Sequence, residues 1–309
     1  METFPVVLFA YKRPQHTARV LERLAQNVGA SEMALIVFAD GAKPGASVTD
    51  LEAIAATRAL LERPWPFKRV TLHAAPANMG LKNAVIGGLS TVLQHHAAAI
   101  VLEDDIEVGP WFFRYMQHEL RLHLQASHVA GVSGFAYPVR KGYLPPAHYL
   151  LPIGCSWGWA VYARSWQALQ TDVALLLAQI APLQQRFDFG GYPFFSILQG
   201  QSHGTVDSWA ILFYASFFLQ GQQFVLPQRS LSQNAGFGTA ATHTVQRDYF
   251  FDRVQASALE PPLPPQPAEA HAATTTEIAH CFRAQLVERT PPGLLARTKG
   301  WIKRLILRA

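Results

Sequence analysis

The strongest constraint on the fold is a regular alternation of short apolar runs with helix-like segments in the first 110 residues. Four strand-like runs recur at similar spacing, at residues 6–10, 35–39, 69–73 and 99–103. Helix signals fall between them: Pro14 suits a first turn, Ser47 suits an N-cap, and a third helical segment spans residues 81–95. Such alternation requires right-handed crossovers between strands. The sequence therefore predicts an α/β fold with a mostly parallel sheet flanked by helices.

Beyond residue 110 the alternation is less regular. Helices are expected at about 111–125, from about 165 and at about 207–219, with a strand at about 129–134. We interpret this half as a substrate-binding region continuous with the first sheet. The stretch 261–267 holds five prolines, which is typical of an extended connector.

Composition narrows the cellular setting. The two cysteines, Cys155 and Cys281, lie far apart without the spacing of a disulfide framework or a metal site, which fits a reducing cytoplasm. The chain enters a strand-like run at once, without signal-peptide features, and its longest apolar stretch, 209–219, is too short to span a bilayer. We therefore expect a cytoplasmic protein.

The net charge of +5 arises from an excess of basic residues in the C-terminal tail. Six basic residues and no acids follow Glu288, so the rest of the chain is close to −1. A basic tail on a nearly neutral body does not indicate a nucleic-acid-binding protein, and no nucleic-acid partner is expected.

Residues 293–309 have the pattern of an amphipathic helix. At 100° per residue, the large apolar side chains fall within an arc of about 140° and the basic ones occupy the rest. This profile is typical of a helix lying on anionic lipid. The alternative is a helix that docks on the protein body or on a second subunit. We favour the membrane, and expect a peripheral protein on the inner face of the cell membrane.

Acidic residues follow two of the predicted strands. Asp40 follows the second run, and Glu103, Asp104 and Asp105 close the fourth. Carboxyl ends of parallel strands share the sheet edge at which α/β folds bind ligands, and hard divalent cations prefer carboxylate oxygen. We favour a diphosphate held by a metal ion. The alternatives are that Asp40 starts a turn with Gly41 and that the three acids cap a following helix.

Four segments together resemble the nucleotide-sugar half of a GT-A fold glycosyltransferase: 5–14 (PVVLFAYKRP), 38–41 (FADG), 78–81 (NMGL) and 103–105 (EDD). They are similar in particular to bacterial family 2-type sugar transferases, which share features with the N-acetylglucosaminyltransferase I group. The resemblance covers about residues 4–245. It implies a GT-A-like Rossmann-type catalytic domain at 1–255, with a nucleotide-sugar half at 1–110 and an acceptor half at 111–255. A Pro-rich connector at 256–273 and C-terminal helices at 274–309 follow, the last of them amphipathic and basic.

The resemblance implies donor-binding roles. Ala10, Tyr11 and Arg13 would border the base and ribose of a nucleoside diphosphate sugar, for which UDP is the expected nucleotide, and Asp40 would hydrogen-bond the base. The loop 78–83 enters a helix, so Asn78 and Lys82 would approach the donor. The alternative for this loop is ordinary helix-starting chemistry, with Asn78 as the cap.

The resemblance also implies a metal site. Asp105 would bind Mn²⁺ or Mg²⁺ bridging the two phosphates, Asp104 would lie near the ribose, and Glu103 would lie near the sugar or the metal's waters. The family signature is D-x-D, and this chain has Glu in the first place. A divalent cation would stabilise the charge that builds on the diphosphate leaving group. His243, in a segment that resembles a flexible loop late in this fold, would complete the metal site.

Asp207 is the expected catalytic base, because in the resembling proteins an Asp just before an aromatic residue at a helix start has that role. The base would deprotonate the acceptor hydroxyl as it attacks the anomeric carbon. The alternative is that Asp207 caps the helix that follows, and its amide hydrogen bonds would then make it a weaker base. Trp157, Trp159 and Trp209 are candidates for an acceptor-sugar platform, with core packing as the alternative.

The predicted function is metal-dependent, inverting transfer of a hexosyl or N-acetylhexosaminyl group from a nucleotide-sugar donor to a glycan or lipid-linked acceptor. The setting would be bacterial cell-surface polysaccharide synthesis. One alternative is a sugar nucleotidyltransferase, which would normally carry a Gly-rich basic loop after the first strand, where this chain has 10–14 without glycine. The other is a non-catalytic nucleotide-sugar or glycan-binding protein.

Overall fold

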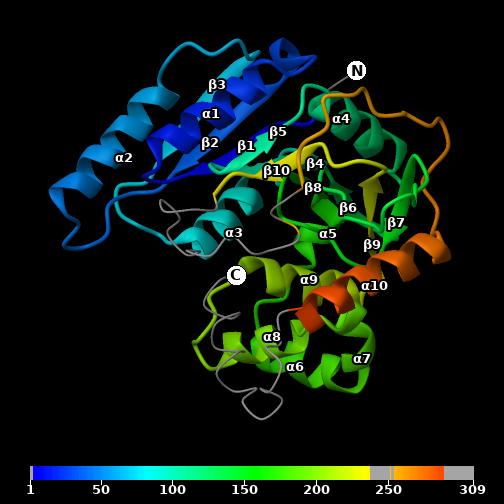
Figure 1. Ribbon diagram of the computed structural model, residues 1–309. Coiled ribbons are helices and arrows are strands. Elements are labelled where there is room, and N and C mark those ends of the chain that lie inside the picture. Colours follow the sequence, from blue (N-terminus) through cyan, green and yellow to red (C-terminus); the bar gives the residue numbers. More distant parts are fainter. Residues whose placement is uncertain (1–2, 237–250, 252–253, 289–309) are drawn as a thin grey trace.

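The predicted α/β fold is confirmed. A computed structural model describes residues 3–236, 251 and 254–288 (Figure 1). Its main sheet has eight strands in the order β3-β2-β1-β4-β8-β6-β9-β7. The four strands of the first half run parallel to one another: β1 (Val6–Ala10), β2 (Ala34–Ala39), β3 (Arg69–Ala74) and β4 (Ala98–Glu103). Helices connect them in turn: α1 (Pro14–Ala25), α2 (Val48–Leu61) and α3 (Leu81–Val92).

The sheet is covered on both faces at its centre, which explains why β1, β2 and β4 are almost continuously apolar in sequence, whereas the edge strand β3 is not. Successive side chains of a strand point to opposite faces. In β1, Val7 and Phe9 join one apolar core, together with Leu89 of α3. Val6 and Leu8 join the other core, together with α1 and α4. The sheet therefore separates two cores and carries its polar groups at the strand ends.

The second half of the sheet is mixed. Strand β8 pairs antiparallel with β4 and β6, β7 pairs antiparallel with β9, and β6 pairs parallel with β9. These strands are β6 (Val129–Ser133), β7 (His148–Leu151), β8 (Trp159–Tyr162) and β9 (Gln223–Pro227). The helices of this half are α4 (Phe112–Leu122), α5 (Ala163–Gln167), α6 (Val173–Ile180), α7 (Gln184–Phe187), α8 (Phe194–Ser202) and α9 (Trp209–Leu219). The single helix expected from about residue 165 is thus two helices, α5 and α6.

No helix begins at the acidic residues after β4. Residues 106–108 form a short strand, β5 (Ile106–Val108), which pairs antiparallel with β10 (Ser232–Asn234). Helix α4 begins only at Phe112. The helix expected at about 111–125 is therefore α4, and the alternative in which the three acids cap a following helix is wrong. Asp104 and Asp105 lie in a tight turn between two strands, which we call the acidic turn (residues 103–105).

The segment that follows the sheet runs back along α4 before α10 (Ala272–Glu288), as Figure 1 shows. The amide of Ala268 donates over 2.8 Å to Nε2 of His123, the residue that follows α4. The amide of Leu150 in β7 donates to the carbonyl of Glu269 over 3.0 Å. The expected basic helix at 293–309 and His243 lie outside the described residues. No helix within the described ranges has the length and hydropathy needed to cross a membrane.

Candidate functional site

Three strand ends bring the predicted donor residues to one edge of the sheet. Ala10 is level with Ala39 in the β1–β2 pair, and Phe9 is level with Glu103 in the β1–β4 pair. The amide of Asp40 continues this register by donating to the carbonyl of Ala10 over 2.9 Å. The segment 10–13, Asp40 and the acidic turn therefore lie at the carboxyl ends of neighbouring strands, where ligands of open α/β sheets bind.

Arg13 neutralises the acidic turn. Its Nη2 atom lies 2.6 Å from Oδ1 of Asp104 and 3.0 Å from Oδ2 of Asp105. The amide of Tyr11 donates to the other Asp104 oxygen over 3.2 Å. Asp104 is 3% exposed, so this carboxylate depends on these donors. The loop after β1 and the turn after β4 are thereby held as one unit.

Two carboxyl groups of the acidic turn have raised pKa values. Burial raises the pKa of Glu103 to about 8, and the neighbouring charges of Asp105 and Asp104 add to the rise. Burial also raises the pKa of Asp104 to about 6, against the opposing effect of Arg13. At neutral pH Glu103 is thus mainly protonated and able to donate a hydrogen bond, whereas Asp104 is mainly ionised.

Helix α1 adds further basic groups that the sequence analysis missed. Nε of Arg19 lies 3.0 Å from Oε1 of Glu107, and burial together with Arg19 lowers the pKa of His16. Arg13, His16 and Arg19 are three residues apart, so they share one helix face. The three-residue spacing of these basic groups, together with the acids at 104, 105 and 107, was the signal in the sequence that indicated their pairing.

Asp40 and Asn78 meet each other at this edge. The Asp40 carboxylate accepts hydrogen bonds from the amides of Gly41 (2.8 Å), Met79 (2.8 Å) and Gly80 (3.1 Å), and from the Asn78 side chain (2.8 Å). Asp40 is 9% exposed. Its carboxylate therefore fixes the loop at 78–80 that leads into α3. Binding of a nucleotide base by Asp40 stays a prediction.

Lys82 and Asp207 form an ion pair, although they are far apart in sequence. Lys82 lies in the first turn of α3, and Asp207 lies just before α9. The side chain of Asp207 is 70% exposed, and that of Lys82 is 26% exposed. The alternative in which Asp207 caps α9 is wrong, because the N-cap is Ser208, whose Oγ accepts from the amide of Ile211 over 3.4 Å. The Asp207 carboxylate therefore remains at the surface of the molecule.

Two of the three tryptophans predicted to bind the acceptor are core residues. Trp159 and Trp209 are 2% and 6% exposed and stack with their ring centroids 4.9 Å apart. Their packing against the aromatic core around Phe213 leaves no ring face for a sugar. We correct the acceptor assignment accordingly for Trp159 and Trp209. Trp157 is half-buried against the Phe135 ring, with 5.0 Å between the ring centroids, and acceptor binding by Trp157 stays a prediction.

The acidic turn does not form a metal site made of protein ligands alone, and Asp105 is its one predicted metal ligand. Within residues 3–236, 251 and 254–288, no three His, Cys, Asp or Glu side chains are grouped so as to hold a metal ion. Gly236 lies so close to Asp105 that a Cβ at residue 236 would overlap Oδ2 of that carboxylate. The backbone at Gly236 therefore packs closely against this oxygen, which Arg13 also contacts. A carboxylate is a hard oxygen donor of the kind that Mg²⁺ and Mn²⁺ prefer, and metal binding by Asp105 stays a prediction.

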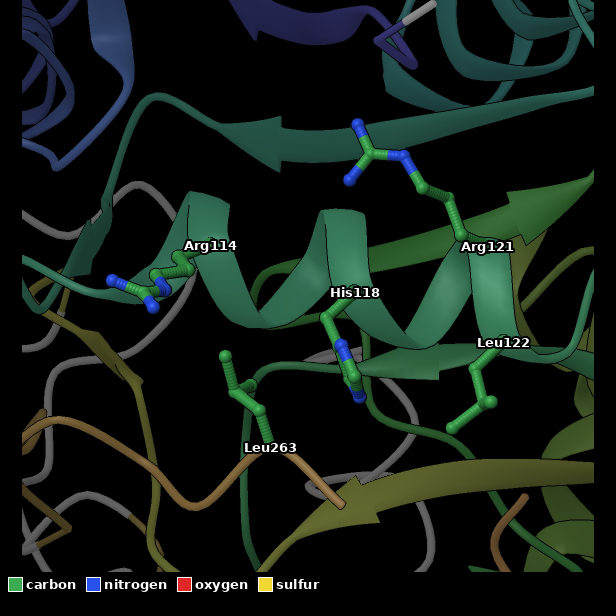
Figure 2. Close-up of a pocket in the computed structure, with 5 residues that line it drawn as sticks. All are labelled: Arg114, His118, Arg121, Leu122 and Leu263. Atoms are coloured by element: carbon green, nitrogen blue, oxygen red, sulfur yellow. The ribbon is translucent and has the colours of Figure 1, made fainter. Parts of the chain in front are cut away.

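A separate groove of about 510 Å³ lies against α4. It is lined by Arg114, His118, Arg121, Leu122 and Leu263, none of which was predicted to be functional. Figure 2 shows the Arg121 guanidinium above α4 and the Arg114 guanidinium beside the other end of that helix, well apart from it. Their charges therefore do not converge on one ligand. We assign the candidate site to the edge of the sheet.

Comparison with known proteins does not assign this chain to a family. Neither the family models nor the curated proteins compared with the sequence include one that matches it. Among solved structures, S. aureus TarS is similar, with 12% sequence identity and a TM-score of 0.35. The matched region covers 53% of this chain and 29% of the TarS chain. The chain thus spans less than a third of TarS, and at this TM-score the likeness says nothing about activity.

Proposed function

We propose that this chain is a glycosyltransferase that moves a sugar from a nucleoside diphosphate donor to an acceptor hydroxyl with inversion. The observation that carries the proposal is the position of Asp207. Asp207 comes about a hundred residues after the acidic turn in sequence. Its carboxylate nevertheless contacts Lys82, which lies at the start of α3 in the nucleotide-sugar half. The Asp207 side chain is also exposed, and it does not cap α9. A carboxylate of this kind beside a donor site meets the needs of a catalytic base.

The donor would lie along the edge formed by β1, β2 and β4. Ala10, Tyr11 and Arg13 would border the base and ribose, with Asp104 near the ribose and the loop pinned by Asp40 beside them. UDP is the nucleotide we expect. Lys82 would bind the diphosphate; the support is its position in the N-terminal turn of α3, where an anion is favoured.

A divalent cation, Mn²⁺ or Mg²⁺, would be held by Asp105 and would offset the charge that grows on the departing diphosphate. The support is the hard oxygen donor that the Asp105 carboxylate provides in the turn after β4. Glu103 would lie near the sugar or the water molecules bound to the metal ion.

Asp207 would take the proton of the acceptor hydroxyl while the hydroxyl oxygen forms its bond to the anomeric carbon. The bond from that carbon to the diphosphate breaks at the same time, and the nucleoside diphosphate leaves with the electron pair. Because attack and departure take place on opposite faces, the anomeric configuration inverts. Trp157 is the remaining tryptophan candidate for contact with an acceptor sugar.

The acceptor we propose is a glycan or a lipid-linked saccharide, as in polysaccharide synthesis at the cell surface. The support is the basic, amphipathic sequence of residues 293–309, which would bind an anionic membrane surface from the cytoplasmic side. Sedimentation with anionic and with neutral vesicles tests this. Equal binding to both kinds of vesicle, or none to either, would remove the membrane from the proposal.

The decisive experiment measures binding and hydrolysis of a panel of nucleoside diphosphate sugars with and without Mn²⁺. Wild type is compared with Asp105→Ala and with Glu62→Gln, an exposed acid at the far end of α2 that serves as a matched control. We expect one nucleoside diphosphate to be released in a metal-dependent way by wild type and the control, but not by Asp105→Ala.

Other outcomes of that experiment separate the alternatives. No metal-dependent binding of any donor would contradict the proposal. Donor binding without turnover in any acceptor mixture would favour a nucleotide-sugar-binding protein. Formation of pyrophosphate from a nucleoside triphosphate and a sugar phosphate would identify a nucleotidyltransferase.

A further inference from the structure

The ion pair between Lys82 and Asp207 joins the two halves of the candidate site. Lys82 belongs to the nucleotide-sugar half and Asp207 to the acceptor half. The helices that carry them, α3 and α9, pack against each other in one apolar core. The pair therefore rests on a fixed scaffold, and only the two side chains need to move for it to open.

A bound donor would bring a second source of negative charge to Lys82. No side chain caps the start of α3, where Gly80 has a φ of 76°. The preceding amides of Met79 and Gly80 are already bound by Asp40, which fixes the position of this helix start. The positive end of the helix dipole and the Lys82 ammonium together favour an anion at this place.

We propose that Lys82 exchanges partners during the reaction. It holds Asp207 in the free protein and moves to the diphosphate when the donor binds. Asp207 then becomes free to accept the proton of the acceptor hydroxyl only after the donor is in place. Lys82 is thus a positioning residue for the catalytic base as well as a donor contact. This inference rests on the proposed function.

The strength of the pair suits such an exchange. An ion pair with one largely exposed partner is weak. When Asp207 no longer competes with the donor for Lys82, the affinity for the donor is expected to change about two- to fivefold. The diphosphate of a bound donor would offer the ammonium several anionic oxygens, whereas Asp207 offers one carboxylate. A deeply buried pair would resist opening at this step.

The test measures the dissociation constant of the donor by calorimetry for four proteins: wild type, Asp207→Asn, Lys82→Gln and the double variant. The exchange predicts an unusual result for Asp207→Asn, namely donor binding that is about two to five times tighter with transfer lost. Lys82→Gln weakens donor binding. In the Lys82→Gln background, Asp207→Asn gives no tightening, because no ammonium is left to release.

Controls separate the exchange from a general charge effect. Glu62→Gln removes one negative charge far from the pair and leaves the donor dissociation constant unchanged. Lys82→Arg restores donor binding and keeps its sensitivity to Asp207→Asn. A purely structural role for the pair would change the unfolding free energy of each variant without this pattern in donor affinity.

Three outcomes overturn the inference, and they distinguish its failure from the failure of the proposed function. An unchanged donor dissociation constant in Asp207→Asn, or tightening that persists without Lys82, rejects the exchange while the glycosyltransferase proposal stands. Failure of the wild-type protein to bind any donor rejects the proposed function itself and the exchange with it.

Discussion

Nη2 of Arg13 donates to Oδ1 of Asp104 over 2.6 Å, and this contact ties the loop after β1 to the turn after β4. Both elements belong to the candidate donor site. Asp104 is buried, and its burial raises its pKa to about 6. Arg13 opposes that rise and keeps the carboxylate mainly ionised at neutral pH. The arginine therefore organises the site even without a ligand.

Substitution of Arg13 by Gln is expected to destabilise the protein. It leaves the buried Asp104 carboxylate without its ionic partner, at a cost of about 2–4 kcal/mol in the free energy of unfolding. Urea unfolding at pH 7 measures this. Arg19→Gln is the matched control, because the Arg19 side chain is 46% exposed and its pair with Glu107 is worth less than about 1 kcal/mol. Equal losses in the two variants would contradict the structural role of Arg13.

Replacement of Asp40 by Ala is expected to release the loop at 78–80. The carboxylate accepts from three backbone amides and from Asn78, and these donors would lose their partner. We expect a loss of about 3 kcal/mol in the free energy of unfolding and faster hydrogen exchange at Met79 and Gly80. Asp172→Ala, which removes the exposed N-cap of α6, is the control and costs about 1 kcal/mol. Unchanged exchange at Met79 would show that the loop is held by other contacts.

Local sequence signals were sufficient for the first half of the fold. The run at 6–10 is β1 as predicted, and the other three strands of that half differ from prediction by one residue at one end. Ser47 caps α2 by accepting from the amide of Asp50 over 3.1 Å. The buried strands β1, β2 and β4 are largely apolar runs, and α1 and α2 have their own start signals at Pro14 and Ser47.

The second half depends on contacts that the sequence does not reveal locally. Strands β7 and β8 have four residues each and find antiparallel partners far away in the chain. The same holds for the site. Asp207 precedes a Ser, and either residue suits an N-cap, so only the backbone geometry decides for Ser208. The partners of Arg13 likewise follow from strand order, not from spacing along the chain.

Trp157 and Trp159 are expected to respond differently to substitution by Ala. Trp159 is fully packed, so its removal costs about 3–5 kcal/mol in the free energy of unfolding. Trp157 is half-buried and contacts Phe135 edge-to-face, which is worth about 1 kcal/mol. If Trp157 contacts the acceptor, its substitution raises the KM for acceptor and leaves the donor dissociation constant unchanged. An unchanged acceptor KM would remove Trp157 from the site.

His123 makes the stability of the protein depend on pH. The amide of Ala268 donates to its Nε2 over 2.8 Å, so that nitrogen carries no proton, and Nδ1 donates to the carbonyl of Glu119 over 3.0 Å. The ring is therefore neutral, and burial lowers its pKa below the ordinary value of 6.5. Between the lowered pKa and 6.5, the unfolded chain binds more protons at this residue than the folded protein does.

The unfolding free energy is consequently expected to fall as pH drops below about 6.5, with a slope of up to about 1.4 kcal/mol per pH unit from this group. Urea unfolding between pH 5 and pH 8 measures the slope for wild type, for His123→Gln and for the control His203→Gln, in which an exposed histidine is replaced. His123→Gln loses this part of the slope and the control keeps it. An NMR titration of wild type provides a direct check, because a His123 pKa at or above 6.5 would show that protonation does not compete with the Ala268 hydrogen bond.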